Sequence, residues 1–549
     1  MGVSTVILNN ETLMTVNDTT ATASQVAAGE YYYAADGTKT VGTGTTMAVG
    51  ITDTTDTAGG TIREITAISL GNDTVTAEHL ESGYTAHDAQ GNAITGSLVP
   101  GGGTVSRSDV NFYDYDGSLV ASHTKAEINA MTSDSDLPTN PSHTGLTAQG
   151  WNWTVAQLKA QLTAMPDQPV DVGQMYITTS GATEIDVIMQ DGRLSPILTL
   201  AVNGTVSVDW GDNTTPDTVT GTSLSTMVDA GPHTYASAGS YTIKISVTSG
   251  TFTFYNNGNK LTLRRSTVQN ENRVYANCIK NVRIGVGVNK IGIYAFTYCQ
   301  SLATITIPNS VADIGANSFS CCYSLTSITI PSGITSISAS MVYYCYSLAS
   351  IAIPSSVTSF GVSVFGYCDS LTNITIPSGV TSIGASMFNY CHSLSSLIIP
   401  NGITTIGGSM FYDCYSLSSI TIPNSVTILG TSLFYDCHSL TSIAIPSGVT
   451  KINSGTFYYC YSLTSITIPS GVTSIDTNAF NNCRGIATYY FKPTTPPALT
   501  NTNTFSNIPS DCVIYVPYSA DHSILNAYQT ASIWSNYASY MQEEQAPTT

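Results

Sequence analysis

Apolar and polar positions recur through the second half of the chain with a period of 23 residues. Cysteines occupy every 23rd position of residues 299–483, and prolines occupy every 23rd position of residues 308–469. A short apolar run with strand-like alternation precedes each proline. Self-similarity at a fixed period predicts a solenoid, in which each repeat forms one coil and neighbouring coils bury a continuous core.

The period that begins at Cys391 shows the apolar positions. Leu394, Leu397 and Ile399 have the spacing of one inward-facing strand, and Pro400 follows directly. We expect the strand to end there, because proline has no N–H for the next ladder bond. Phe411 and the next cysteine are expected to close the coil from the back.

Residues 279–484 fit the pattern L-x-x-L-x-L-P-x-x-[VI]-x-x-I-G-x-x-x-F-x-x-C. This pattern resembles the BspA-like type of leucine-rich repeat. The resemblance implies a mainly β rod, with residues 251–278 as a transition and N-terminal cap and residues 485–549 as a C-terminal cap. Val342 replaces the Phe of the pattern and Phe360 replaces the Ile, in neighbouring coils.

The ladder of cysteines has three interpretations. Metal binding needs ligands that converge on one point, and a line of single thiols does not converge. Disulfides between coils would have a suitable spacing, but the side chains would be parallel and the count of nine is odd. The sequence therefore predicts buried, reduced thiols that act as small apolar side chains.

A second repeat lies near the N-terminus. Residues 20–44 and 74–98 align with an offset of 54, and each contains a Gly-bearing site typical of a tight hairpin turn. These small β modules resemble modules found near the N-terminus of structural proteins of tailed phages. The resemblance implies that residues 1–100 form an attachment region.

Residues 101–172 are predicted to contain a flexible linker and a small α/β segment. A strand and turn are expected at residues 110–117, and a helix at residues 154–164. The Asp-x-Asp-Gly sequence at residues 114–117 resembles the start of a calcium loop, but the later Glu is missing, which favours a plain turn.

Residues 173–250 resemble a PKD-type immunoglobulin-like β-sandwich. The resemblance rests on Val-Asp-Trp-Gly-Asp at residues 208–212, His-Thr-Tyr at residues 233–235 and an alternating strand after them. It implies a spacer or a module near a sugar. Asp209 and Asp212 have two interpretations, as calcium ligands or as residues that stabilise a turn.

Composition narrows the function. Only 10% of residues are charged and the net charge is −19, which argues against nucleic acid or an anionic membrane as partner. No apolar run approaches the length of a membrane span, and the N-terminus has no basic segment or apolar core of a signal peptide. The sequence contains no HExxH, G-x-S-x-G or P-loop pattern, so we expect no enzyme, cofactor or metal site.

The positions two before, one before and one after each ladder cysteine are expected to point outward. Thirteen of these 27 residues are Tyr, and the others are mostly small or polar, as in antibody paratopes. An alternative is drift among copied repeats. The receptor-contact candidates are Tyr343, Tyr344, Tyr346, Tyr367, Asp369, Tyr390, His392, Tyr412, Asp413, Tyr415, Tyr435, Asp436, His438, Tyr458, Tyr459 and Tyr461.

The sequence thus predicts a multidomain, mainly β recognition protein, and our first interpretation is a structural virion protein of a tailed bacteriophage. The N-terminal region would bind other virion proteins, the solenoid would bind a glycan or protein on the host surface, and the protein would be a homo-oligomer without nucleic acid or membrane insertion. It would be made in the host cytoplasm and reside in the virion. The alternatives are a bacterial BspA-like surface or secreted adhesin, and a carbohydrate-active enzyme with attached repeats.

Overall fold

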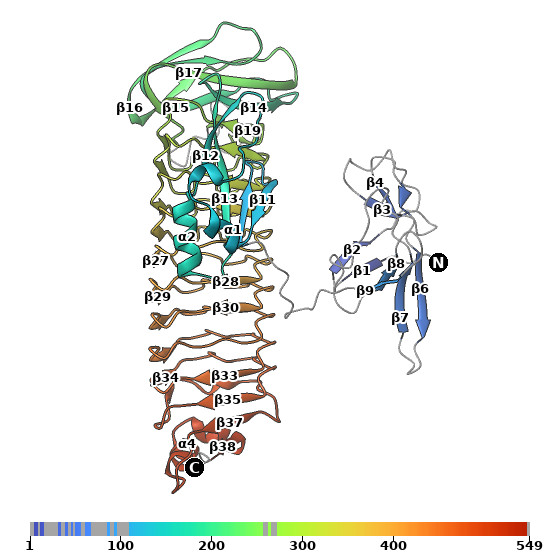
Figure 1. Cartoon of the computed structure of the whole chain (residues 1–549), viewed down its shortest axis with the longest axis vertical. Helices are drawn as coiled ribbons and strands as arrows, with labels where there is room; N and C mark the ends of the chain where they lie inside the picture. The colour runs from blue at the N-terminus through green and yellow to red at the C-terminus, as the bar shows by residue number, and fades with distance from the viewer. Residues whose placement is uncertain are drawn as a thin grey trace. The chain divides into compact units, whose positions relative to one another are not determined.

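The computed structural model of the chain describes residues 109–255, 262–264 and 272–545, together with short strands before residue 96. The chain divides into two compact units, Met1–Arg107 and Ser108–Thr549 (Figure 1). The linker predicted at the start of residues 101–172 lies outside the described residues.

In the N-terminal unit, the two predicted repeats contain equivalent hairpins. Strand β3 (Tyr31–Tyr33) pairs antiparallel with β4 (Lys39–Val41), and β8 (Thr85–His87) pairs with β9 (Ala93–Thr95) in the same register, 54 residues later. The other described strands of this unit are β1 (Thr5–Leu8), β2 (Glu11–Thr15), β5 (Thr46–Met47), β6 (Gly50–Thr55) and β7 (Thr61–Thr66).

The second unit contains the predicted solenoid, and the mainly β fold class is confirmed (Figure 1). One strand of each of these coils, in most cases followed by the proline, pairs in parallel with that of the next coil, and these strands form what we call the strand face. These strands are β19 (Ile279–Arg283), β21 (Thr304–Thr306), β23 (Ser327–Thr329), β25 (Ser350–Ala352), β28 (Ser396–Ile398), β30 (Ser419–Thr421), β33 (Ser465–Ile468), β35 (Thr488–Phe491), β37 (Val513–Val516) and β38 (Met541–Glu543).

A second parallel ladder runs along another side of each coil. Its two-residue strands end on the Ile, Leu or Phe that faces the core, such as Ile406. They are β20 (Lys290–Ile291), β22 (Asp313–Ile314), β24 (Ser336–Ile337), β26 (Ser359–Phe360), β27 (Ser382–Ile383), β29 (Thr405–Ile406), β31 (Ile428–Leu429), β32 (Lys451–Ile452), β34 (Ser474–Ile475) and β36 (Ala498–Leu499).

Phenylalanine rings form a column through the solenoid core. The rings of Phe388, Phe411 and Phe434 are stacked with centroids 5.8 and 5.4 Å apart. Val342 interrupts the column, and Phe360 of the next coil packs beside Phe365 with centroids 6.1 Å apart. Each ring is therefore held by the coils on both sides of it.

The cysteines line the core as expected. All twelve are buried, as predicted for the ladder, and none is paired in a disulfide. From Cys322 to Cys483, each ladder Sγ donates to a backbone carbonyl of the preceding coil, as Cys345 does to the Phe319 oxygen at 3.2 Å. Burial raises the pKa of these thiols, including Cys345 and Cys391, so they react slowly at neutral pH.

The sheet before the solenoid differs from the predicted two-sheet sandwich. Its strands are hydrogen-bonded in one seven-stranded sheet that also includes β19 and β21 of the solenoid. They are β14 (Thr183–Met189), β15 (Ile197–Asp209), β16 (Asp217–Ala230), β17 (Gly239–Thr253) and β18 (Leu263–Arg264), followed by helix α3 (Asn272–Ala276). Strand β14 joins the two parts, because it pairs with β17 on one edge and with β19 on the other. The sheet thus covers the first coil and shares its core.

The aspartates considered for calcium hold a turn. Asp209 accepts a hydrogen bond from the Gly211 N–H at 2.9 Å, and Asp212 lies 2.8 Å from His233 Nε2. The His233 ring stacks on Trp210. Across the described residues, no group of His, Cys, Asp or Glu side chains is placed to hold a metal ion.

The last coil is covered by aromatic side chains from the C-terminal segment. This segment contains η5 (Thr502–Phe505), the expected strand β37, helix α4 (Ser523–Thr530) and η6 (Trp534–Tyr540). The buried rings of Phe491, Phe505, Tyr528 and Trp534 pack edge to face or tilted against one another. They keep the apolar end of the core from water, as a solenoid terminus requires.

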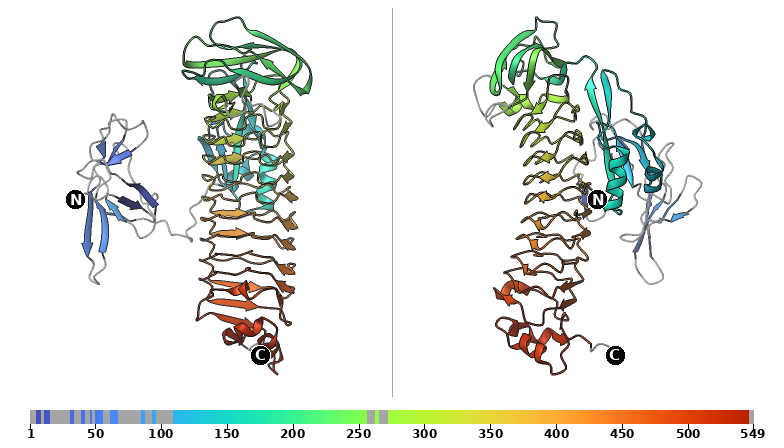
Figure 2. Two further views of the ribbon diagram at one scale, coloured as in Figure 1. Left: turned by 180° about the vertical axis from the view of Figure 1, so that it is seen from behind. Right: turned by 60° about the vertical axis from the view of Figure 1, so that its left-hand side comes forward.

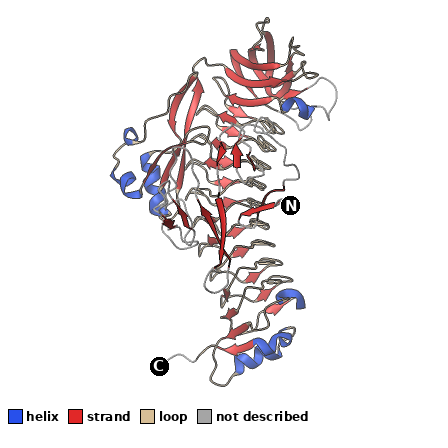
Figure 3. Cartoon of the chain, turned by 90° about the vertical axis from the view of Figure 1, so that its right-hand side faces the viewer, coloured by secondary structure: helices blue, strands red, loops and turns tan. Residues whose placement is uncertain are grey.

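The predicted small α/β segment is present and packs on the strand face (Figures 2 and 3). The sequence predicted the segment but not this packing. Its sheet has the order β11-β10-β13-β12, and its helices follow β11 and β12. The elements are β10 (Val110–Tyr113), β11 (Leu119–His123), α1 (Lys125–Ala130), η3 (Asp134–Asp136), β12 (Leu146–Trp151), α2 (Val155–Ala164) and β13 (Val170–Thr178). Helix α2 begins after its N-cap Thr154, as predicted. Strand β13 crosses the predicted domain boundary between residues 172 and 173.

Glycine makes this close approach possible. A Cβ on Gly173 would lie 2.3 Å from Thr329 Oγ1 and 2.7 Å from the Ala352 Cβ. The backbone of β13 therefore rests directly on β23 and β25, and the turn before β11 adds a hydrogen bond from Ser327 Oγ to the Tyr115 carbonyl.

Phe411→Ala should destabilise the solenoid by about 3–5 kcal/mol, because it removes one ring from the stacked column and leaves a cavity. Hydrogen exchange should rise most in residues 388–437, since each coil contacts only its neighbours. Tyr412→Ala, on the adjacent half-buried ring, is the matched control and should perturb exchange less. Equal effects of the two variants would contradict the assigned core position of Phe411.

Candidate functional site

Each coil turns sharply just before its ladder cysteine, at a corner we call the tyrosine edge. The residue one before the cysteine has a left-handed backbone, so its N–H reaches the next coil. Tyr367, for example, donates to the Asn389 carbonyl at 2.8 Å. The candidates with this backbone, with φ in parentheses, are Tyr344 (62°), Tyr367 (60°), Tyr390 (59°), Asp413 (64°), Asp436 (63°) and Tyr459 (61°).

The residues one after the cysteine form a continuous column along the edge. The His392 ring stacks on Tyr415 with centroids 5.0 Å apart, and its Nδ1 lies 3.2 Å from the Asp369 carboxylate. Tyr415 stacks in turn on His438 at 4.9 Å, and His438 lies 4.9 Å from Tyr461. Alternating imidazole and phenol rings thus present one face along several coils.

A second row of stacked rings begins at the position one before the ladder cysteine and continues at the position two before it. It follows the left-handed residues through Tyr344, Tyr367 and Tyr390, with centroids 4.3 Å apart at each step. It then passes, 5.5 Å away, to Tyr412, which lies two before its cysteine. The row continues through Tyr435 and Tyr458 at 4.4 and 4.7 Å. The change of position occurs where Asp413 and Asp436 replace Tyr at the left-handed corner.

One glycine shows how tightly neighbouring coils pack at this edge. A Cβ on Gly366 would lie 2.6 Å from a ring carbon of Tyr343 and 2.4 Å from Asn389 Oδ1. The Tyr343 ring occupies this space and packs edge to face on Tyr367 with centroids 5.5 Å apart. The rings therefore form a fixed surface rather than a set of independent side chains.

The acidic candidates differ in exposure. Asp413 is only 9% exposed, so it does not point outward as expected, and its Oδ1 has no hydrogen-bond partner. Asp369 and Asp436 are half-buried beside His392 and His438. Burial raises the pKa of both carboxyl groups. The most exposed rings of the edge are Tyr346, Tyr415 and Tyr461, at 37, 39 and 36%.

The structure places the sixteen candidates along one corner of the coils, but sequence reasoning missed the backbone conformation of that corner. Asn317 and Ser340, four residues before the same kind of corner position, also have positive φ, so each coil contains two left-handed residues. Asn482 occupies the corner position in the last coil, with φ of 62°. The recurrence of Asn, Asp and Ser at these two positions was the available signal, because short polar residues tolerate this conformation best.

The fold and its 23-residue coils define a leucine-rich repeat solenoid. Residues 246–372 and 358–487 match the model of the BspA type Leucine rich repeat region. The chain belongs to this family of BspA-type leucine-rich repeat proteins. A search of curated protein sequences finds no match.

Solved structures include several similar proteins. A leucine rich cell surface protein from Faecalibacterium prausnitzii A2-165 is 32% identical over 47% of this chain and 78% of its own, with a TM-score of 0.32. The T. pallidum Leucine Rich Repeat protein is 31% identical over 28% of this chain and 72% of its own, with a TM-score of 0.27. A leucine-rich repeat protein from Bacteroides ovatus ATCC 8483 is 22% identical over 57% of this chain and 90% of its own, with a TM-score of 0.34. None of the helices in the described part of the chain has the length and apolarity needed to cross a bilayer.

The stacked rings make the stability of the solenoid sensitive to alkaline pH. Burial is the main cause that raises the pKa of Tyr343 from 10.0 to about 12, and a hydrogen bond to Asp413 is the main cause that raises that of Tyr415 to about 12. Because the folded pKa values exceed the unfolded ones, this contribution is complete below pH 10 and is lost between pH 10 and 12.

We therefore expect the denaturation midpoint to fall across this pH range while ultraviolet absorbance reports tyrosine ionisation. Tyr415→Phe should weaken the dependence, since it removes one titrating group and keeps the ring. A midpoint that is constant up to pH 12 would be inconsistent with the packing described for the edge.

Proposed function

We propose that the protein is a non-catalytic recognition protein whose tyrosine edge contacts a glycan or protein on a cell surface. The observation that carries this proposal is the conformation of Tyr344, Tyr367, Tyr390 and Tyr459. A bulky residue in the left-handed region is uncommon, and the conformation costs about 1–2 kcal/mol per residue outside Gly, Asn and Asp. Strain of this kind concentrates at functional sites.

The same corner holds Asn482 in the last coil and Asp413 and Asp436 in two others, so the fold does not need tyrosine there. Ring stacking offsets part of the strain, since an aromatic pair contributes about 0.5–1.5 kcal/mol beyond its buried area. What the tyrosines add is a broad surface of half-buried, mutually packed rings. Tyr provides contact area with little loss of side-chain entropy on binding, which suits recognition.

Two classes of protein could present this recognition surface, a bacterial adhesin and a bacteriophage tail component. A bacterial surface or secreted adhesin is favoured by the family and by the F. prausnitzii relative, which is described as a cell surface protein. A tail component of a bacteriophage is favoured by the paired hairpins β3–β4 and β8–β9, whose sequences resemble phage attachment modules. In either case, the N-terminal unit would attach a homo-oligomeric protein to its particle or cell wall.

The neighbouring genes and the location of the protein distinguish the adhesin from the tail component. Capsid, tail and lysis genes beside this gene, and detection of the protein in purified phage particles, would support the tail component. Release of the protein from intact bacteria by surface proteolysis would support the adhesin.

Binding of labelled protein to a panel of intact bacterial cells, measured by flow cytometry, tests the edge. The triple variant Tyr412→Ser, Tyr415→Ser and Tyr435→Ser removes one ring of the exposed column and two of the second row, and it should lower cell binding at least about tenfold. The lost ring contacts should lower its unfolding midpoint, so binding is measured at a temperature at which circular dichroism shows the variant fully folded. The matched control replaces three polar residues of the strand face, with Ser418→Ala, Ser419→Ala and Thr421→Ala. Binding that is lost only in the control would place the contact on the strand face instead.

Tyr459→Asn separates recognition from folding. Asn fits φ of 61° better than Tyr does, but the variant loses the ring contacts with Tyr458 and Tyr461. The two effects are of similar size, so we expect the unfolding free energy to stay within about 1 kcal/mol of its original value. Cell binding should fall nonetheless. A variant that loses more than about 2 kcal/mol of stability would show that Tyr459 serves the fold.

A further inference from the structure

The prolines of the repeat leave one backbone carbonyl of each coil without its ladder partner. In the parallel ladder, the Ile330 N–H donates to the Ala352 carbonyl of the next coil. The next ladder bond would run from the N–H of residue 354 to the Ile330 carbonyl. Residue 354 is proline, which has no N–H, so this bond cannot form. The exception supports this account, because Ile468 faces Lys492 instead of proline and accepts its N–H at 3.0 Å.

The α/β unit supplies the missing donors where it covers the strand face. Asn152 Nδ2 donates to the Ile330 carbonyl at 3.2 Å, and Trp153 Nε1 donates to the Ile353 carbonyl at 2.9 Å. One coil further, Gln161 Nε2 donates to the Ile376 carbonyl at 3.3 Å. These donors are buried, so they satisfy carbonyls that the unit itself shields from water.

Gln161 makes a second contact that defines the chemistry of the site. Its Oε1 accepts the Ser378 N–H, two residues after Ile376, at 2.7 Å. One primary amide thus pairs with both the carbonyl before a proline and the N–H after it. The equivalent pair in the next coil is the Ile399 carbonyl and the Asn401 N–H, and neither has a hydrogen-bond partner among the described residues.

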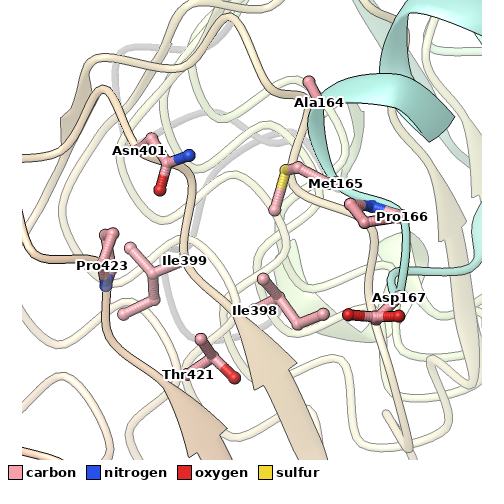
Figure 4. Close-up of a pocket in the computed structure, with 9 residues that line it drawn as sticks. All are labelled: Ala164, Met165, Pro166, Asp167, Ile398, Ile399, Asn401, Thr421 and Pro423. Atoms are coloured by element: carbon pink, nitrogen blue, oxygen red, sulfur yellow. The ribbon is translucent and has the colours of Figure 1, made fainter.

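A cavity lies at this first unfilled pair (Figure 4). Helix α2 ends at Ala164, so Met165, Pro166 and Asp167 form one wall without reaching the pair. Ile398, Ile399, Asn401, Thr421 and Pro423 of two coils form the other walls. The volume of about 170 Å³ is similar to that of cavities that bind a small organic molecule.

We propose that this cavity binds a primary carboxamide, the side chain of a glutamine or asparagine on a partner polypeptide. The carboxamide repeats the contacts of Gln161 one coil further, with its N–H₂ on the Ile399 carbonyl and its oxygen on the Asn401 N–H. The site is independent of the tyrosine edge.

Other side chains match the pair less well. A carboxylate has no donor for the Ile399 carbonyl, and Asp167 in the wall repels it. An ammonium group can donate to the carbonyl and pair with Asp167, but it leaves the Asn401 N–H without an acceptor. A secondary amide in the trans form directs its N–H and C=O to opposite sides, so it cannot reach both partners.

The probe is acetyl-glutamine N-methylamide, titrated into the full chain and followed by methyl NMR signals of Met165, Ile398 and Thr421. We expect saturable shifts at these methyl groups, and at least about fivefold weaker binding of the glutamate and lysine analogues. Comparable binding of either analogue would overturn the carboxamide assignment, as would the absence of shifts with the glutamine probe.

Asn401→Pro removes the proposed donor with little strain. Residue 401 is the second residue of a turn closed by the Ile403 N–H on the Pro400 carbonyl, a position that favours proline. This variant should weaken the glutamine probe about five- to tenfold, whereas Asn401→Ser, which keeps the N–H, should bind it as the unmodified chain does. Ser447→Pro makes the same change in the equivalent turn two coils away and is the matched control. Equal affinity of Asn401→Pro and Ser447→Pro would refute the site.

Discussion

The requirement that each coil satisfy the backbone groups of the next one determines most of this structure. Adjacent coils exchange hydrogen bonds along two parallel ladders and at the left-handed corner, where N–H groups such as that of Tyr390 reach the following coil. A period of 23 residues keeps these groups in register, and the Leu, Ile, Phe and Cys columns fill the space that they enclose. Proline breaks the pattern at one point per coil, and in the coils under the α/β unit Asn152, Trp153 and Gln161 supply the missing donors.

The features that the sequence predicts well are those that repeat. Periodic positions predict the strand pattern, the buried thiols and the common corner of the sixteen candidate residues. The prediction is strong there because the same pattern is seen in every coil, so one atypical coil does not change it. The helix at Val155–Ala164 was also predictable, since Thr154 and Gln157 form a capping box. The left-handed corner was not predicted. Asn482 is typical of a backbone with positive φ, but Tyr344 and Tyr367 at the same position are not.

The features that the sequence did not predict depend on single long-range contacts. Strand β14 continues the first sheet into the solenoid through Arg283, whose guanidinium binds both Glu184 and Asp186, and this replaces the separate sandwich. The α/β unit contacts the strand face through Asn152, which lies about 180 residues before its partner Ile330. Neither contact leaves a periodic trace. The periodic prolines did indicate backbone carbonyls without a ladder donor, but they did not indicate which side chains would donate to those carbonyls.

The docked α/β unit also makes the solenoid mechanically uneven. Through Asn152, Trp153 and Gln161 it bridges three successive coils side to side, while the described residues show no such bridge in the coils between Ile399 and the C-terminal cap. Under tension between its ends, the second unit would yield first in the unbridged coils, one coil at a time. The tyrosine rings from Tyr412 to Tyr461 lie in those coils. A molecule held by them would thus pull on the extensible part of the protein, while the bridged coils stay intact.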